Sequence, residues 1–360
     1  MDSCKFFEAC GGCLYLDLSD DEYHKIKIAK LHEAFVDGRI DDKISPKNIE
    51  FFWVGAKSRR KITLQVDAKN NIGFFAKATK NLVEIDNCYV ADEEISALIP
   101  TLKNFLKSFE NNLFTQIVIT KFDNIIEIVF DGKRELNFAQ SQKIINWSQA
   151  NKVNTSLRFK NHTSLIFATT IARLNFSHNI ILDLNSDIFI QATKQGLEKI
   201  TATICNFIEN NFAKKITIAD IYAGFGAYSF GLAHLAKKIY AFEGAQEMVH
   251  LIEKNAAKNS LSSKIETKMR DLILHPISKK ELEDFDLAII NPPRNGAAPQ
   301  AEKIAQSNLK HLIYVSCNPQ SFARDAKILL DSGFVIDKLV VIDQFYSSSH
   351  LELVAILSKK

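Results

Sequence analysis

The 360-residue sequence lacks several features that define whole classes of protein. No stretch approaches the roughly 20 consecutive apolar residues that cross a bilayer, so we expect no membrane partner. The first residues, MDSCKFF, carry no basic segment followed by an apolar run, so we expect no export signal. Low-complexity tracts, repeats and proline-rich linkers are also missing. These absences predict a globular protein of the cytoplasm, and we also expect it to be a monomer.

A strong charge of either sign is also missing. Lys and Arg total 45 against 42 Asp and Glu, which gives a net charge of +3. Any surface for a polyanion must therefore be a local patch. At 46% hydrophobic residues, the chain is long enough to form two domains with a small appendage.

Cysteine is scarce but clustered. Three of the six cysteines, Cys4, Cys10 and Cys13, fall within ten residues, with Gly11 and Gly12 allowing a tight turn. In a protein that is not exported, this spacing indicates metal binding rather than disulfides. Cys88 is the nearest candidate for a fourth ligand, and the spacing alone leaves zinc and an iron-sulfur cluster open.

Changes in periodicity divide the rest of the chain. Residues 1–45 contain the cysteines and a capped amphipathic helix at 19–35. Residues 46–187 are β-rich and predict an antiparallel sheet, with strand-like runs at 61–67, 72–78, 114–120, 125–131, 163–170 and 179–185.

Residues 188–360 instead alternate strands with helices, which predicts a parallel sheet covered on both faces. The expected strands are 215–223, 238–244, 285–291, 311–317, 338–343 and 352–358. The last two would end the sheet in an antiparallel hairpin, as in the methyltransferase variant of this α/β fold. The fold class is thus α/β with a β-rich N-terminal domain.

A glycine turn after the strand at 215–223 predicts a nucleotide-type site. The sequence DIYAGFGA, from Asp220, places Gly224 and Gly226 where the backbone approaches a ligand closely. It lacks the third glycine of a dinucleotide fingerprint, and the acidic residue before the turn favours S-adenosylmethionine, whose amino-acid end is positive. Glu243, at the end of the next strand, is placed to bind a ribose, and Asp271 is a weaker candidate for the adenine.

Two further motifs follow strands, and so fall at the edge where open α/β sheets bind ligands. Asn291-Pro-Pro-Arg294 follows one strand, and Cys317 ends another. A cysteine in a strand is usually a small apolar residue, but one at this edge is a candidate nucleophile. Cys205, inside a helical segment, is expected to be apolar filling.

These motifs resemble the RNA uracil-C5 methyltransferases, in particular the iron-sulfur branch that modifies 23S ribosomal RNA and lacks an N-terminal barrel. The matching segments span nearly the whole chain: CKFFEACGGC, FIQATKQ, DIYAGFGAYSF, NPPRNG, YVSCNPQSFARD and SSSHLELV. Two departures are Ala223, where many members have Cys, and Asn291, where many have Asp.

The resemblance implies a role for each matching residue. Cys317 corresponds to the nucleophile that adds to carbon 6 of uracil, and Glu352 to the base that removes the proton from carbon 5. The residues implied to contact S-adenosylmethionine or the pocket it shares with uracil are Gln191, Tyr222, Glu243 and Asn291. Cys4, Cys10, Cys13 and Cys88 correspond to the ligands of a [4Fe-4S] cluster. Arg294 is expected to hold the pocket by pairing with a carboxylate or phosphate.

RNA would be held as a looped single strand with the target uridine flipped out. The basic run from Lys57 to Lys61, followed by Phe74, Phe75 and Lys77, is the candidate contact surface. Ribosomal RNA is the expected substrate and transfer RNA the alternative. A methyltransferase for exocyclic amines, which also uses Asn-Pro-Pro, and an iron-sulfur RNA-binding protein without catalysis are the competing hypotheses.

Overall fold

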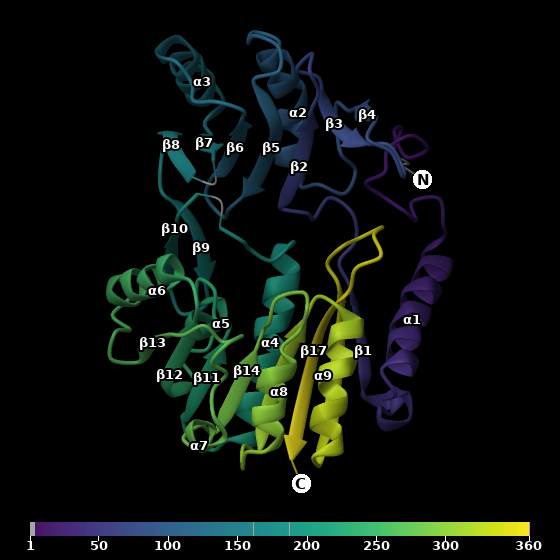
Figure 1. Cartoon of the computed structure of the whole chain (residues 1–360), viewed down its shortest axis with the longest axis vertical. Coiled ribbons are helices and arrows are strands. Elements are labelled where there is room, and N and C mark those ends of the chain that lie inside the picture. The colour runs from purple at the N-terminus through teal and green to yellow at the C-terminus, as the bar shows by residue number, and fades with distance from the viewer. Residues whose placement is uncertain (1–3, 161, 187, 360) are drawn as a thin grey trace.

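The computed structural model describes residues 4–160, 162–186 and 188–359. Residue 187, where the sequence placed a domain boundary, lies outside the described residues. Two main sheets lie at opposite ends of the molecule, and α1 (Asp20–Asp37) runs along one side of the larger one (Figure 1). Within the described residues, no helix is both long and apolar enough to cross a membrane.

The larger sheet has eight strands in the order β1-β16-β17-β15-β14-β11-β12-β13. Strand β17 pairs antiparallel with both of its neighbours, and all other pairs are parallel. The strands are β1 (Ile49–Trp53), β11 (Ile216–Ile221), β12 (Ala236–Glu243), β13 (Ile265–Met269), β14 (Leu287–Ile290), β15 (His311–Ser316), β16 (Phe334–Asp343) and β17 (Glu352–Lys359).

Strand β1 departs from the expectation. It was expected to join the β-rich region, and the hairpin of β16 and β17 was expected to end the large sheet. Instead β1 pairs in parallel with β16, Ile49 opposite Leu339, and forms the edge beyond the hairpin. Helix α1 packs against α9 (Pro319–Asp331), so the short connection after α1 delivers β1 to the backbone groups that β16 would otherwise leave unpaired.

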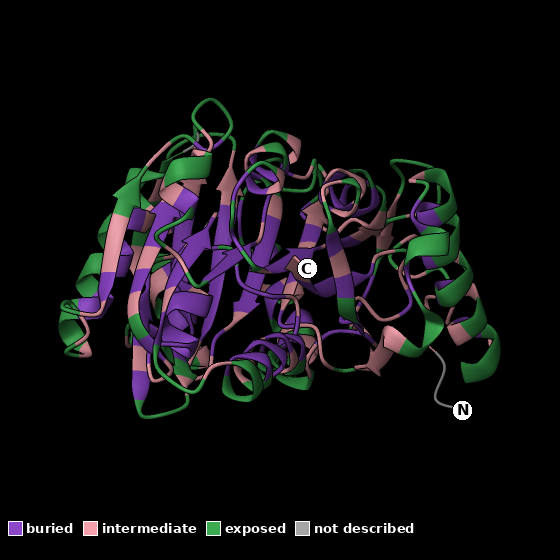
Figure 2. Ribbon diagram, turned by 90° about the horizontal axis from the view of Figure 1, so that it is seen from below, coloured by how far each residue is buried: buried purple, intermediate pink, exposed green. Residues whose placement is uncertain are grey.

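Successive residues of the central strands face opposite sides, as buried parallel strands require. In β14, Leu287 and Ile289 belong to one hydrophobic core, and Ala288 and Ile290 belong to the other. In Figure 2 buried residues fill the sheet, and the flanking helices turn exposed residues outward. The helices of this part are α4 (Lys194–Asn211), α5 (Ala227–Gly231), α6 (Gln246–Lys258), α7 (Lys279–Leu282), α8 (Ala298–Ala305) and α9.

The smaller sheet has seven strands in the order β4-β3-β2-β5-β6-β7-β8. All of its pairs are antiparallel, as expected, except β6 with β7, which α3 connects. Its elements are β2 (Lys61–Val66), β3 (Ile72–Phe75), β4 (Leu82–Glu84), α2 (Glu93–Leu106), β5 (Phe114–Lys121), β6 (Ile126–Gly132), α3 (Phe138–Asn151), β7 (Asn154–Phe159) and β8 (His162–Phe167). Helices α2 and α3 cover a third core.

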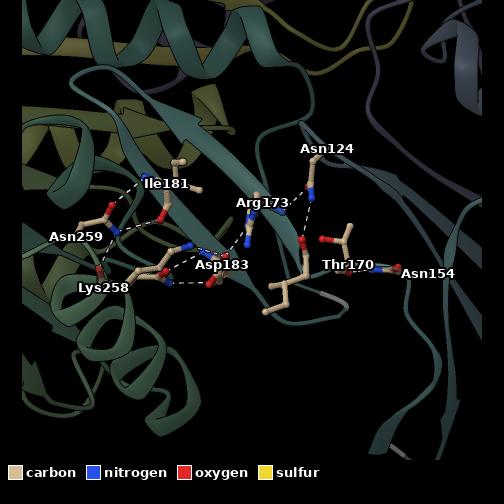
Figure 3. Close-up of polar contacts among 10 residues, drawn as sticks. Asn124, Asn154, Thr170, Arg173, Ile181, Asp183, Lys258 and Asn259 are labelled. Atoms are coloured by element: carbon tan, nitrogen blue, oxygen red, sulfur yellow. Dashed lines mark hydrogen bonds and ion pairs between the residues drawn. The ribbon is translucent and has the colours of Figure 1, made fainter.

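A hairpin of β9 (Ala172–Phe176) and β10 (Ile180–Leu184) links the two sheets. Toward the large sheet, the carboxylate of Asp183 accepts from Arg173 at 2.9 Å and from Lys258 at 2.6 Å (Figure 3). The side chain of Asn259 accepts from the amide of Ile181 and donates to its carbonyl. Toward the small sheet, Asn124 donates to Ile171 O at 2.9 Å. The hairpin therefore fixes the chain just before the pocket residues that begin at Ile188.

Candidate active site

A pocket of about 860 Å³ opens at the carboxyl edge of the large sheet. The sequence-predicted residues among its lining are Gln191, Tyr222, Glu243, Asp271, Asn291, Arg294, Cys317 and Glu352. They come from seven different strand ends or loops. The sequence expectation that these side chains converge is therefore what the structure shows, because the carboxyl ends of β11, β12, β14 and β15 meet at this edge beside the start of β17.

The glycine turn forms the floor of the pocket. Tyr222, Gly224 and Gly226 all have positive φ, of 63°, 55° and 86°. A Cβ at position 226 would lie 3.0 Å from Phe230 and 3.1 Å from Ile252, so this position favours glycine for space as well as for conformation. Of the two glycines, only Gly224 is among the described residues that line the pocket, and its backbone carries no side chain there.

Asp220 does not act as the sequence suggested. Its carboxylate does not line the pocket; it is buried and accepts from the amide and the hydroxyl of Ser229, at 3.0 and 2.6 Å. Burial raises the pKa of Asp220 to about 6. The residue therefore holds the start of α5 in place beneath the turn, one layer below the residues that line the pocket.

Glu243 ends β12 and faces the pocket. Its two carboxylate oxygens accept from the backbone amides of Gly224 and Ala245, each at 2.9 Å. These bonds fix the carboxylate beside the glycine turn, where its remaining lone pairs can accept ribose hydroxyls. Asp271 also lines the pocket, and its Oδ1 accepts from the amides of Ile273 and Leu274.

The loop that follows β14 is fixed by the segment after Cys317. The carbonyl of Arg294 accepts from Asn318 Nδ2 and from Ser321 Oγ, both at 3.1 Å. The Arg294 guanidinium lies 3.3 Å from His350 Nδ1, whereas the sequence predicted a carboxylate or phosphate partner. The loop after β14 and the segment after Cys317 are therefore joined by hydrogen bonds and form one wall of the pocket.

Cys317 follows β15 directly and is half-buried, with its side chain on the pocket. Burial raises the pKa of its thiol, the charge of Glu352 raises it further, and Arg294 lowers it. The sulfur is therefore neither sealed in the interior nor turned away from the pocket.

Glu352 opens β17 and is only 2% exposed. Burial raises its pKa to about 7, and a hydrogen bond from Gln344 opposes that rise. Gln344, at 1% exposure, donates to Glu352 Oε2 at 3.0 Å and to Gln191 Oε1 at 2.7 Å. Sequence reasoning missed Gln344; the one available signal was a polar residue directly after β16, at the same edge as Glu352.

The four predicted cluster cysteines also come together. Cys4, Cys10, Cys13 and Cys88 line a second pocket, of about 250 Å³. Burial raises the pKa of Cys13 to about 12, and the nearby charges of Cys88 and Cys10 raise it further. Among the described residues, no three Cys, His, Asp or Glu side chains are placed to hold a single metal ion. A four-iron cluster binds each thiolate through a different iron, so its ligands stand further apart.

The basic run is only partly available to a ligand. Arg60 is buried and pairs with Asp123 at 2.9 Å, so this part of the run is structural. Lys57 pairs with Glu93, and Arg59 lines the cysteine pocket and lies over the ring of Phe345. Phe345 also lines the large pocket, so Arg59 lies between the two pockets.

A parallel sheet with a glycine turn, an acidic residue ending the second strand and an inserted antiparallel strand defines the Rossmann-like methyltransferase fold. A solved structure of Pyrococcus abyssi tRNA (uracil-54, C5)-methyltransferase with S-adenosyl-L-homocysteine shares this fold, with a TM-score of 0.74 and 22% identity over 97% of this chain and 86% of that chain.

The family model for tRNA (uracil-5-)-methyltransferases matches residues 59–360, and the chain belongs to this family. Similar relatives include the 23S rRNA (uracil(1939)-C(5))-methyltransferases RlmD of Dichelobacter nodosus, 25% identical over 99% of this chain and 84% of that protein, and of Haemophilus influenzae, 26% identical over 99% and 82%. An uncharacterized RNA methyltransferase of Caldanaerobacter subterraneus is 28% identical over 99% and 84%.

Proposed function

We propose that this protein methylates carbon 5 of a uridine in RNA, with S-adenosylmethionine as the methyl donor. The observation that carries the proposal is one pocket that joins a half-buried thiol, a buried carboxyl with a pKa near 7 and a glycine turn beside Glu243. When bound, S-adenosylmethionine supplies an electrophilic methyl group. Gln191, Tyr222, Glu243 and Asn291 are proposed to contact it or to line the pocket that it shares with uracil.

Carbon 5 of uracil is a poor nucleophile, and the thiol of Cys317 overcomes this. After losing its proton to water, the sulfur bonds to carbon 6, and the electrons of the ring double bond move to carbon 5. Carbon 5 takes the methyl group as its bond to the sulfonium sulfur of the donor breaks, which leaves S-adenosylhomocysteine. Carbon 5 then carries both a methyl group and a hydrogen. Glu352 accepts that hydrogen as a proton, the ring double bond re-forms, and the bond from carbon 6 to sulfur breaks.

The proposed substrate is 23S ribosomal RNA, since relatives that match nearly all of this chain are named for that activity. Transfer RNA is the alternative, because the family model and the Pyrococcus abyssi protein are named for it. The test is mapping of 5-methyluridine in both RNAs from a deletion strain and its parent. Loss of a ribosomal site supports the first proposal, loss of a transfer-RNA site supports the alternative, and loss of neither contradicts both.

The nearest rival activity, methylation of an exocyclic amine, needs no nucleophilic thiol. A Cys317→Ala variant should therefore lose all turnover under the present proposal and keep it under the rival. Binding of S-adenosylmethionine, which Cys317→Ala should retain, separates loss of chemistry from loss of the fold. A protein that binds RNA without catalysis would incorporate no methyl group into bulk RNA even as wild type.

We further propose that Cys4, Cys10, Cys13 and Cys88 bind a [4Fe-4S] cluster. Their shared pocket and donor type fit such a group, and Gly11 fits the tight wrap, since a Cβ there would lie 2.7 Å from Phe75 O. The methyl transfer involves no net electron transfer, so the cluster would be structural or contact RNA. Iron and sulfide assays on anaerobically purified protein test this, and stoichiometric zinc without sulfide would contradict it.

The remaining proposals concern assembly. The β-rich part, 46–187, is proposed to bind RNA, and the protein to act as a monomer in the cytoplasm. Light scattering of the purified protein with and without RNA tests the oligomeric state, and a dimer would contradict it.

A further inference from the structure

The connection between β16 and β17 contains a buried glutamine that the proposed chemistry does not use. Gln344 follows β16 directly and donates from one nitrogen, Nε2, to two acceptors. These are Gln191 Oε1 at 2.7 Å and Glu352 Oε2 at 3.0 Å. An amide nitrogen carries two hydrogens, so both are used.

The acceptors fix the orientation of the Gln344 amide. If the Gln344 amide were flipped, its oxygen would face the Glu352 carboxylate oxygen and the Gln191 side-chain oxygen. Neither of these oxygens carries a hydrogen to donate. The Gln344 Oε1 atom is buried without a partner in the described structure, which is the cost of this arrangement. Gly196 provides the space, because a Cβ there would lie 2.4 Å from that oxygen.

The backbone of Gln344 is also held from outside the pocket. Its neighbour Asp343 is buried and pairs at 2.7 Å with Lys27, which also donates to His350 O at 2.7 Å. Tyr23 donates to the same carboxylate and accepts from the amide of Ser347. The connection can therefore not shift without breaking a buried ion pair.

The chain of side chains continues to α5. Gln191 Nε2 donates to the hydroxyl of buried Tyr228 at 3.4 Å, so a line of hydrogen bonds runs from Tyr228 through both glutamines to Glu352. An amide nitrogen gives hydrogens but accepts none, so this line cannot relay a proton. Its function must be to hold groups in place.

We propose that Gln344 is a positioning residue for the proton-removal step: it holds the Glu352 carboxylate in the direction of carbon 5 and ties it to Gln191. This inference rests on the proposed uracil-C5 methylation. Cys317 attacks before Glu352 is needed, so loss of Gln344 should spare addition and methyl transfer and slow only release.

The hydrogen bond also favours the ionised carboxylate that the step requires. Burial raises the pKa of Glu352, and the bond from Gln344 lowers it. The described titratable groups that face Glu352 are Tyr228 from α5 and Cys317 after β15, and the charge of Arg294 also acts on Cys317. Without Gln344 the pKa of Glu352 rises, so the defect should be largest at neutral pH and smaller near pH 9.

The test is a Gln344→Leu variant of the full-length protein, incubated with S-adenosylmethionine and an RNA that contains ordinary uridine. We expect kcat to fall roughly 10- to 100-fold, the scale of a misplaced catalytic group. A methylated protein–RNA adduct should accumulate on a denaturing gel, more at pH 7 than at pH 9. Turnover within twofold of wild type without an adduct would overturn the proposal, as would a block before methyl transfer.

Two further variants separate positioning from folding. Gln300→Leu is the matched control, since Gln300 is also buried but its side chain bonds, among the described residues, to the backbone of Ile277, away from the pocket. It should lower stability without accumulating the adduct, and accumulation in it would overturn the proposal. Gly196→Ala displaces the Gln344 amide without removing it, so it should reproduce the adduct even where Gln344→Leu does not fold. Failure of the wild-type protein to react with 5-fluorouridine RNA would instead refute the proposed function.

Discussion

Replacing Glu352 by Gln should stabilise the folded protein at alkaline pH while it stops product release. In the native state the Glu352 carboxyl is 2% exposed and its pKa lies at about 7, against 4.5 for an unperturbed glutamate. As pH rises from 4.5 to 7, the unfolded chain loses this proton and the native chain keeps it. Stability is therefore lost across this window, and the loss is complete above pH 7.

The size of the effect follows from the two pKa values. A tenfold difference in proton affinity corresponds to about 1.4 kcal/mol, so ionisation of Glu352 costs the native state roughly 3 kcal/mol at pH 8. A glutamine side chain carries no charge, and its oxygen can still accept the hydrogen bond from Gln344. The variant should avoid this cost at pH 8 and gain little at pH 4, where the carboxyl is protonated in both states.

The assay is the free energy of unfolding from urea titrations of Glu352→Gln and wild type at pH 4, 6 and 8. The difference between the two proteins should grow with pH in favour of the variant. A difference that stays constant across the three pH values would contradict this prediction, because it would show that burial does not perturb the titration of Glu352.

Other perturbations have equally definite outcomes. Lys27→Met leaves the buried Asp343 carboxylate without its cation and should lower the free energy of unfolding by about 3–5 kcal/mol. In thermal unfolding, the double variant with Asp343→Leu should recover part of this loss. No recovery would contradict a paired role for the two residues. In Gly226→Ala, the new Cβ would sit at a residue with a φ of +86° and close to the ring of Phe230, so the turn should be distorted. Calorimetry should show S-adenosylmethionine binding at least tenfold weaker. Unchanged affinity would exclude the turn as the binding site. Cys88→Ser should lower the iron content of anaerobically purified protein, and an unchanged content would remove Cys88 from the ligand set.

The large sheet and most of its pocket could be predicted from the sequence, for one physical reason. Parallel strands have all their carboxyl ends at one edge, so residues that follow strands, such as Asn291 and Cys317, must meet there. Glu352 arrives at that edge by opening an antiparallel strand. The strand pattern placed it there, but its role as the base rested on the resemblance.

The features that the sequence did not reveal depend on tertiary contacts. The pairing of β1 (Ile49–Trp53) with β16 depends on α1 packing beside α9. Asp220 and Arg60 were expected to face ligands, yet each has a buried partner, Ser229 and Asp123 respectively, that no local pattern marks. Gln344 gains its place only when β16 and β17 bring it beside Gln191.

The most direct test of the account is the covalent bond from the Cys317 sulfur to uracil. Intact-protein mass spectrometry after incubation with S-adenosylmethionine and a 5-fluorouridine RNA measures it, since fluorine at carbon 5 cannot leave as a proton and release is blocked. We expect a stable adduct that carries a methyl group, maps to Cys317 in peptides and is missing from Cys317→Ala. An adduct on another residue, or methylated RNA made by Cys317→Ala, would contradict it.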